Sequence, residues 1–178
     1  MISDEHKDKD FEVVLSSPKI LPWKKLITTM EELRKEDSQD RKIIGMTSGC
    51  FDLLHLGHLY ALKKAKSFCD VLIVGVNSDQ SVHHLKGNNR PVQDEKTRSL
   101  LIAALIYVDY VMLFDEASAA YFVDIVQPNL IIKDKYKLCD WPNAEKISSF
   151  GGKMIKLDKI DGYSTTDIIK KINDGNVK

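Results

Sequence analysis

The chain has 178 residues, 43% of them hydrophobic, and its 26 basic and 26 acidic side chains give a formal net charge of +0. This length predicts one globular domain, and the balanced charge argues against sequence-independent binding to nucleic acids or membranes. The cysteines, an odd number without a Cys-x-x-Cys pair, indicate neither a disulfide framework nor a zinc site, and without an apolar leader or membrane-spanning run we expect a cytoplasmic protein.

The N-terminal part of the chain is predicted to extend that domain. Residues 1–10 are crowded with charged side chains and predict a disordered tail, and residues 11–15 predict a short strand or docking segment. Apolar side chains recur near helical spacing between residues 23 and 35, which predicts an amphipathic helix. A polar connector follows, so we divide the chain into a tail with its helix at residues 1–42 and a domain at residues 43–178.

From residue 43 onward, strand patterns alternate with helix patterns. Short apolar runs predict strands at residues 43–47, 71–76, 108–114, 130–133 and 154–157. Helices are predicted at residues 57–68, 94–106, 117–126, 143–150 and 165–172. Such alternation predicts an α/β fold with a Rossmann-like, doubly wound parallel sheet, as a single domain with an N-terminal helical extension. Sheets of this kind bind ligands beyond the carboxyl ends of their strands.

The first predicted strand leads into a turn that carries two histidines. His55 and His58 flank Gly57 at the mouth of the next helix, where free backbone N–H groups bind anions and imidazoles can donate to phosphate. Two surface histidines in an ordinary turn are the alternative, but the position directly after the first strand favours a phosphate site. In the same turn we interpret Asp52 as turn-stabilising, with a metal contact as the alternative, and Cys50 as a small packed residue rather than a nucleophile.

This His-x-Gly-His motif resembles that of the cytidylyltransferase-like nucleotidyltransferase superfamily, and other stretches resemble the adenylyltransferase domain of ADP-heptose synthase. These stretches are residues 75–82, 85–87, 90–92, 95–98, 107–111 and 161–168. The resemblance covers residues 43 to about 173. It implies a transfer of AMP from ATP to a heptose 1-phosphate with release of pyrophosphate. It also implies Mg²⁺ or Mn²⁺ with the nucleotide, no metal site built from protein residues, and a homodimer.

The resemblance also implies roles for individual residues. His55 and His58 would hold the α- and β-phosphates and stabilise the charge that grows on the leaving pyrophosphate. Lys86, on a loop next to a glycine, would supply a mobile positive charge for the triphosphate or for the acceptor phosphate. The residues implied to contact the nucleotide are Gly49, Cys50, Phe51, Gly57, Asn77, Arg98, Tyr163, Ser164 and Thr165.

Three of these roles compete with structural interpretations, which stay open at this point. Lys86 can be an ordinary solvated loop lysine. Arg98 can bind a phosphate through two N–H groups of its guanidinium, or it can form an intrahelical ion pair with Glu95 or Asp94. Residues 164–167, Ser-Thr-Thr-Asp, have the form of a capping box at the start of the last helix. A helix start of this kind can be capped and still bind phosphate.

Two alternative functions remain open. Glycerol-3-phosphate cytidylyltransferases, which use CTP and a small phosphate, share the histidine motif and the Ser-Thr-Thr motif, although the strings at residues 48–52 and 85–87 favour the heptose enzymes. Both families typically place a Gly-Gly-Asp type loop after the fourth strand, where this chain has residues 133–137, Lys-Asp-Lys-Tyr-Lys. A nucleotide-binding module with weakened catalysis is therefore the second alternative. The expected partners are ATP or CTP and a phosphorylated sugar or polyol.

Overall fold

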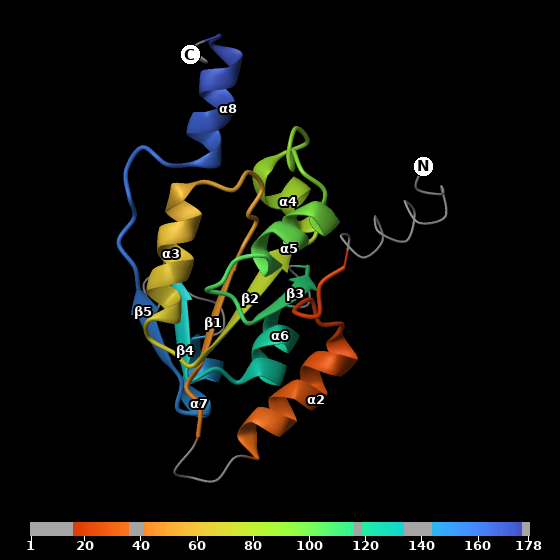
Figure 1. Cartoon of the computed structure of the whole chain (residues 1–178), viewed down its shortest axis with the longest axis vertical. Coiled ribbons are helices and arrows are strands. Elements are labelled where there is room, and N and C mark those ends of the chain that lie inside the picture. The colour runs from red at the N-terminus through yellow and green to blue at the C-terminus, as the bar shows by residue number, and fades with distance from the viewer. Residues whose placement is uncertain (1–15, 36–40, 116–118, 134–143, 176–178) are drawn as a thin grey trace, which may run out of the picture.

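The structure, a computed structural model, describes residues 16–35, 41–115, 119–133 and 144–175. Its strands form one sheet, in which every neighbouring pair is parallel, in the order β3-β2-β1-β4-β5 (Figure 1). The strands are β1 Ile44–Gly49, β2 Val71–Asn77, β3 Tyr110–Phe114, β4 Leu130–Lys133 and β5 Lys153–Lys156. The predicted parallel sheet is therefore confirmed, with strand ends that differ from the prediction by at most two residues.

Helices connect these strands and cover the sheet. They are α2 Trp23–Arg34, α3 Leu56–Lys66, α4 Asp79–Lys86, α5 Glu95–Ala103, α6 Ala119–Val126, α7 Ala144–Ser149 and α8 Thr165–Asn173. Among these helices of the described residues, α4 alone was not predicted. Its signals were nevertheless present in the sequence, because Ser78 caps the helix by accepting from the Ser81 amide at 3.1 Å and Gly87, with φ of +91°, ends it.

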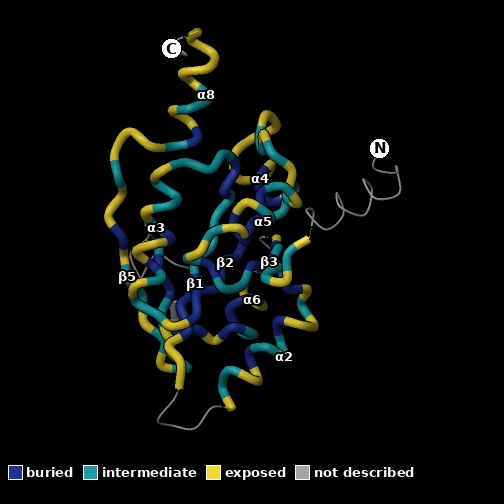
Figure 2. Tube along the Cα trace, viewed as in Figure 1, coloured by how far each residue is buried: buried dark blue, intermediate teal, exposed yellow. Residues whose placement is uncertain are grey.

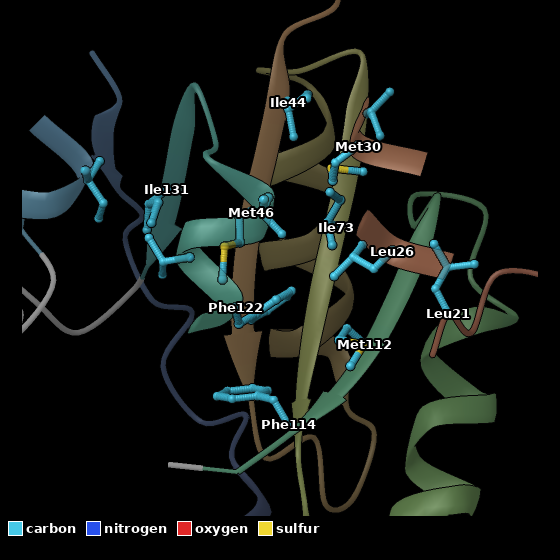
Figure 3. Close-up of a cluster of buried hydrophobic side chains, with 14 residues drawn as sticks. Leu21, Leu26, Met30, Ile44, Met46, Ile73, Met112, Phe114, Phe122 and Ile131 are labelled. Carbon is cyan, nitrogen blue, oxygen red and sulfur yellow. The ribbon is translucent and has the colours of Figure 1, made fainter. Parts of the chain in front are cut away.

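Two apolar layers cover the two faces of the sheet. On one face, shown in Figure 3, α2, α6 and α7 pack on the strands, and the layer includes Leu26, Met30, Met46, Ile73, Met112, Phe122, Ile131 and Ile147. On the other face, α3 and α5 pack on a layer that includes Leu62, Ala65, Leu72, Val74, Val76, Ile102, Val111 and Ile132. Helices on both faces of a parallel sheet are the doubly wound arrangement that the sequence predicts.

Helix α2 is part of the main core. Leu26 and Met30 are fully buried in the same apolar layer as the sheet residues (Figure 3). At the end of the helix, the Arg34 guanidinium donates to the carbonyl oxygens of Ile125 at 2.9 Å and Val126 at 2.7 Å. These contacts cap the last turn of α6, where carbonyl groups lack partners within the helix. The helix is thus packed into the domain, while the boundary predicted at residue 43 stays a prediction.

The segment before α2 covers the open edge of β3. Ile20 forms a parallel bridge with Val111, and the Lys19 ammonium donates to the carbonyl oxygens of Leu105 at 3.1 Å and Val108 at 2.7 Å. An edge strand with free N–H and C=O groups invites pairing with another chain. Covering this edge protects the sheet. The strand or docking segment predicted at residues 11–15 lies outside the described residues.

The sheet opens between β1 and β4. Strand β1 pairs with β2 along its whole length, from Ile44 to Gly49, but with β4 only at Gly45 and Met46. The direction in which the chain adds strands also reverses here. After β1 it adds β2 and then β3 on one side of β1, and β4 and β5 follow on the other side. This reversal is the topological switch point at which open α/β sheets bind their ligands.

Candidate active site

The turn between β1 and α3 is held in an uncommon backbone conformation. Phe51 has φ of +48° and only 9% of its surface exposed, and its ring lies 5.1 Å from that of His58, centroid to centroid. A Cβ atom on Gly49 would lie 3.3 Å from the Phe51 ring, so a larger residue would crowd the turn. Positive φ at a bulky residue is strained and persists only where the surroundings enforce it. The turn therefore has a fixed shape at the carboxyl end of β1.

The two histidines stack at the start of α3. His55 is the N-cap residue, in an extended conformation, and His58 lies in the first helical turn. Their rings are 3.7 Å apart, centroid to centroid, with 19° between the ring planes. Both Nδ1 atoms are buried without a hydrogen-bond partner among the described residues. Buried polar atoms usually have partners, so two such atoms side by side at a helix N-terminus are consistent with a ligand site.

Both imidazoles are held in the neutral form. Burial lowers the pKa of His58 from 6.5 to about 4, and repulsion from His55 acts in the same direction. Burial also lowers the pKa of His55, against which the Asp167 carboxylate acts. An anion bound beside the rings would stabilise their charged forms and raise both pKa values. The pair can therefore donate hydrogen bonds when neutral and gain positive charge when a polyanion arrives.

The start of α8 lies against the histidine pair. A Cβ atom on Gly57 would stand 2.9 Å from the carbonyl oxygen of Tyr163 and 3.0 Å from Nδ1 of His55. Only glycine allows this close approach of the two segments. Asp167, in the first turn of α8, is close enough for its charge to raise the pKa of His55 against the effect of burial. Residues more than 100 positions apart in the chain thus form one site at the N-termini of α3 and α8.

The helix cap predicted for Ser164 at α8 is confirmed, although Asp167 answers it through the Ser164 hydroxyl rather than the Ser164 backbone amide. The Ser164 Oγ accepts from the Asp167 amide at 3.1 Å and donates to the Asp167 carboxylate at 2.7 Å. Thr165 is buried and Tyr163 is 47% exposed. For Ser164 to donate to a phosphate, its hydroxyl must turn away from Asp167. The predicted phosphate contacts of Ser164 and Thr165 stay predictions.

Arg98 joins three segments of the site from within. Its side chain is fully buried and donates to the carbonyl oxygens of Gln93 at 2.9 Å and Cys50 at 2.6 Å, and to Oδ1 of Asp79 at 2.7 Å. These bonds connect the turn after β1 to the starts of α4 and α5. The ion pair is made with Asp79 on another helix, and not with a residue of α5 itself as one interpretation held. The contact with phosphate predicted for Arg98 stays a prediction, since the guanidinium is buried among these partners.

Asp52 stabilises the turn, as predicted. Its side chain is 1% exposed, and its carboxylate accepts from the amides of Val92 at 2.7 Å and Gln93 at 3.0 Å and from Nε of Arg90. All three of these hydrogen bonds hold the loop before α5 against the turn that contains Asp52. The ion pair between Arg90 and Asp52 joins residues 38 positions apart, so their spacing in the sequence does not predict it.

Lys86 differs from its prediction in its local structure. It is the last residue of α4 and not part of a loop, and its side chain is exposed. Burial raises the pKa of the Cys50 thiol, while the positive charges of Lys86, Arg98 and Arg90 act to lower it. The Lys86 charge thus acts on the Cys50 thiol in the turn after β1. Its proposed action on phosphate is compatible with that position.

Asn77 has a structural partner. It ends β2 with 5% of its surface exposed, and its Nδ2 donates to the Ser81 hydroxyl in the first turn of α4 at 2.9 Å. Glu95 supports the same helix, since its carboxylate accepts from the Asp79 amide at 2.8 Å. Sequence reasoning missed this role of Glu95, because it did not predict α4. The nucleotide contact implied for Asn77 stays a prediction.

Lys133 lies at the opening between β1 and β4. It is the last residue of β4, and its ammonium donates to the carbonyl oxygen of Ser48 at 3.0 Å and to the Ser48 hydroxyl. Ser48 directly precedes Gly49 at the end of β1. Residues 134–137, where the sequence departs from the expected glycine-rich loop, lie outside the described residues.

The acidic side chains near the site do not fit a metal ion bound by the protein itself. Among the residues that the structure describes, no group of three or more His, Cys, Asp and Glu side chains could hold a metal. The carboxylate of Asp52 is taken up by amides and Arg90, and that of Asp167 by Ser164. In the same described part of the chain, no helix is both long and apolar enough to span a bilayer.

Comparisons with known proteins show the family to which the chain is similar. A family model described as cytidylyltransferase-like matches residues 46–171. The bifunctional protein HldE of Helicobacter pylori (strain G27) is 44% identical over 156 residues, which are 87% of this chain and 31% of that protein. The bifunctional protein HldE of Nitrobacter hamburgensis is 38% identical over 163 residues. The chain thus spans about a third of the length of these curated relatives.

Solved structures show the same fold. The lipopolysaccharide core biosynthesis protein of Thermoplasma volcanium GSS1 superposes with a TM-score of 0.57 and 33% identity, over 67% of this chain and 99% of that chain. The pantoate-beta-alanine ligase of Francisella tularensis superposes with a TM-score of 0.57 at 16% identity, over 90% of this chain and 79% of that chain. These likenesses confirm the Rossmann-like fold that the sequence predicts.

Proposed function

The chain belongs to the cytidylyltransferase-like family, and from this premise we propose that it is a nucleotidyltransferase that moves AMP from ATP to a sugar 1-phosphate, most specifically a heptose 1-phosphate. One observation supports this more than any other. The stacked imidazoles of His55 and His58, with two buried Nδ1 atoms that lack partners, lie where the N-termini of α3 and α8 meet. Two helix N-termini and two imidazoles form a cradle for several phosphate groups.

In the proposed reaction, a phosphate oxygen of the acceptor attacks the α-phosphorus of ATP. The bond from that phosphorus to the oxygen bridging to the β-phosphate breaks, and pyrophosphate leaves with the electron pair. A phosphate oxygen needs no base, so the protein supplies position and charge. His55 and His58 donate to the α- and β-phosphates and stabilise the charge on the leaving group. Lys86 supplies a positive charge from the end of α4.

The rest of the site serves this reaction by holding the cradle in place. Arg98 and Asp52 fix the turn after β1 to the loops that precede α4 and α5. Mg²⁺ or Mn²⁺ belongs to the substrate in this proposal, because such ions are held mainly by triphosphate oxygens and water. Homodimerisation and a cytoplasmic location are part of the same proposal and rest on the sequence alone.

Adenine and heptose are proposed from the similarity to the HldE proteins. The motif strings of this chain resemble the adenylyltransferase domain of ADP-heptose synthase, and HldE proteins match 82–91% of the chain. The solved relative at 33% identity is described as a lipopolysaccharide core biosynthesis protein, which fits a sugar nucleotide as the product. The comparisons do not favour a cytidylyltransferase.

The test is pyrophosphate release by the purified protein with ATP or CTP, each with Mg²⁺, and a panel of acceptors. The panel contains D-glycero-D-manno-heptose 1-phosphate, a hexose 1-phosphate and glycerol 3-phosphate. Release with ATP and the heptose phosphate is the expected result, and a protein with His58→Ala serves as the control with strongly reduced turnover. Release with CTP and glycerol 3-phosphate would replace the proposal by the cytidylyltransferase. Nucleotide binding without release across the panel would leave a binding module.

A further inference from the structure

The loop before α5 carries an unpartnered hydrogen-bond acceptor next to the turn after β1. Gln93 is half-buried, and its Oε1 atom is buried without a hydrogen-bond partner within the described part of the chain. The main chain of Gln93 is held on both sides. Its amide donates to Oδ1 of Asp52 at 3.0 Å, and its carbonyl oxygen accepts from Nε of Arg98 at 2.9 Å. The side-chain amide is therefore attached to a fixed backbone beside the turn that contains Asp52.

The chemistry of this atom limits what can bind it. A buried acceptor without a partner lowers stability, so such an atom is a candidate for contact with a ligand or an ordered water. The Oε1 atom of a glutamine accepts hydrogen bonds, so its partner must be a donor such as a hydroxyl group. An ionised phosphate oxygen is itself an acceptor and does not satisfy it. A hydroxyl group of a substrate fits this requirement.

The direction of the proposed reaction assigns this hydroxyl to the acceptor. In a phosphoryl-type displacement, the attacking and leaving oxygens lie roughly in line through the phosphorus. The cradle proposed for the leaving pyrophosphate lies where the starts of α3 and α8 meet. Helix α5 packs against β2 and β3, on the side of β1 away from β4 and β5, the strands that precede α8 (Figure 1). The acceptor is therefore expected on the side of the loop that carries Gln93.

Lys86 acts on the same turn and complements this amide. It ends α4 with an exposed side chain, and its charge acts on the thiol of Cys50, two residues before Asp52. A phosphorylated sugar has an anionic phosphate and neutral hydroxyl groups. A flexible ammonium suits the phosphate, and a fixed amide suits a hydroxyl. Lys86 and Gln93 thus offer the two kinds of contact that a sugar phosphate needs.

We propose that Gln93 is a specificity-determining residue of this site, whose side-chain amide binds a hydroxyl group of the sugar acceptor. This inference rests on the proposed nucleotidyltransferase function and deepens it, because it names a residue that recognises the sugar. The hydroxyl donates to Oε1 and gives the buried acceptor its partner. A site that bonds a substrate hydroxyl rejects an analogue without it strongly, since a buried polar group is then left unpaired.

A structural role for Gln93 predicts different behaviour. If Oε1 holds only an ordered water, replacing the side chain changes stability and leaves the preference among acceptors as it was. If Gln93 binds the sugar, its replacement matters for one particular hydroxyl of the acceptor. The two roles are therefore separated by changing the protein and the acceptor together.

The experiment compares the unmodified protein with Gln93→Met and Gln80→Met. Methionine has a similar length without the amide, and Gln80 is an exposed glutamine on α4, which makes Gln80→Met the matched control. The acceptors are D-glycero-D-manno-heptose 1-phosphate and a set of analogues that each lack one hydroxyl group. The measurements are kcat/KM from pyrophosphate release, the Kd of MgATP by calorimetry, and the Tm.

Gln93→Met should lower kcat/KM for the complete acceptor by about tenfold, the effect of one unpaired hydrogen-bonding group in a buried site. In the unmodified protein, one of the deoxy analogues should show a similar loss. In Gln93→Met that same analogue should show little further loss, because removing either partner of one bond removes the same interaction. The Kd of MgATP and the Tm should stay unchanged, and Gln80→Met should match the unmodified protein throughout.

Several results would overturn the proposal. These are an unchanged kcat/KM in Gln93→Met, losses that add for every analogue, and a lower Tm with equal losses for all acceptors. A raised Kd of MgATP in Gln93→Met would assign the hydroxyl to the nucleotide and overturn its assignment to the acceptor. An unmodified protein that releases no pyrophosphate with any acceptor would overturn the proposed function itself, and this inference with it.

Discussion

At the scale of single residues, the site depends on groups that are neutral until the ligand arrives. His55 and His58 stack at 3.7 Å, a distance at which two positive charges would repel strongly. Their buried Nδ1 atoms have no partner among the described residues, so the free protein carries a local cost that a phosphate can relieve. The arrangement favours ligand binding over stability of the free state.

The first prediction concerns His58. Replacing it with alanine removes one donor to the developing charge, so turnover should fall by about 10²-fold or more. The fold should remain intact, because no hydrogen bond of the buried Nδ1 is lost. Pyrophosphate release and the Tm are the measurements, and His84→Ala, an exposed histidine on α4, is the control. An unchanged rate would show that the phosphate cradle lies elsewhere.

The second prediction is that nucleotide binding takes up protons. In the free protein the pKa of His58 is about 4, and burial also lowers that of His55. The Phe51 ring packs against that of His58, and the charge of Asp167 raises the pKa of His55. A bound triphosphate raises both pKa values, so between pH 4 and the pKa of the bound state the complex holds more protons than the free protein.

Calorimetry in buffers of different ionisation enthalpy measures this uptake. The binding enthalpy of MgATP at pH 6 should depend on the buffer, with uptake of up to about one proton per histidine, and affinity should rise as the pH falls from about 8 to about 6. His58→Gln should remove part of this dependence. A binding enthalpy that is the same in all buffers would contradict the prediction.

At the scale of elements, function depends on how two helix starts meet. Helix α3 follows β1 directly, whereas α8 comes at the far end of the chain and extends beyond the sheet in Figure 1. Figure 2 shows that most of the α8 surface is exposed, and Thr165 is its buried residue. The contact between the carbonyl of Tyr163 and Gly57 therefore positions α8 over the histidines.

The third prediction concerns that contact. In Gly57→Ala, the new Cβ would lie 2.9 Å from the Tyr163 carbonyl oxygen, and backbone cannot yield as a flexible side chain can. Strain of about 1–3 kcal/mol should move the start of α8 and weaken MgATP binding by about tenfold. Hydrogen exchange at residues 163–167 should become faster. Leu56→Ala, an exposed neighbour in the same turn, is the control, and unchanged affinity and exchange would show that the contact is dispensable.

At the scale of the whole molecule, one continuous body supports the site. The apolar layer on one face of the sheet joins α2 to α6, α7 and the strands (Figure 3). Trp23 of α2 also contacts Tyr121 of α6, with ring centroids 5.1 Å apart. The site lies at the carboxyl edge of the same sheet. A rigid support matters because phosphoryl-type transfer depends on the placement of groups more than on covalent chemistry.

The fourth prediction follows from the burial of α2. Leu26→Ala should lower the free energy of unfolding by about 2–5 kcal/mol, because it leaves a cavity in the shared core. Lys24→Ala, an exposed position on the same helix, should change it by less than about 0.5 kcal/mol. Urea unfolding measures both. A loss at Leu26 as small as that at Lys24 would mean that α2 is an appendage and not part of the core.

The sequence by itself determined the order of strands and helices, because hydrophobic periodicity and caps such as Asp94 and Ser164 are local properties. It also indicated the histidine pair, because His55 and His58 are three residues apart after a strand. It missed α4, which is short and polar, although Ser78 and Gly87 marked its ends. With the exception of α4, local signals were therefore sufficient for features that depend on neighbours in the chain.

Only the tertiary structure decided how distant residues meet. The close approach of Tyr163 to Gly57, the burial of Arg98 against Cys50 and Asp79, and the reach of Lys133 to Ser48 each join segments far apart in sequence. Their partners depend on strand order and on the packing of helices, which side-chain type and spacing do not encode locally. The pKa values of the histidines are a further case, because burial and neighbouring charges, set by the packing, determine them.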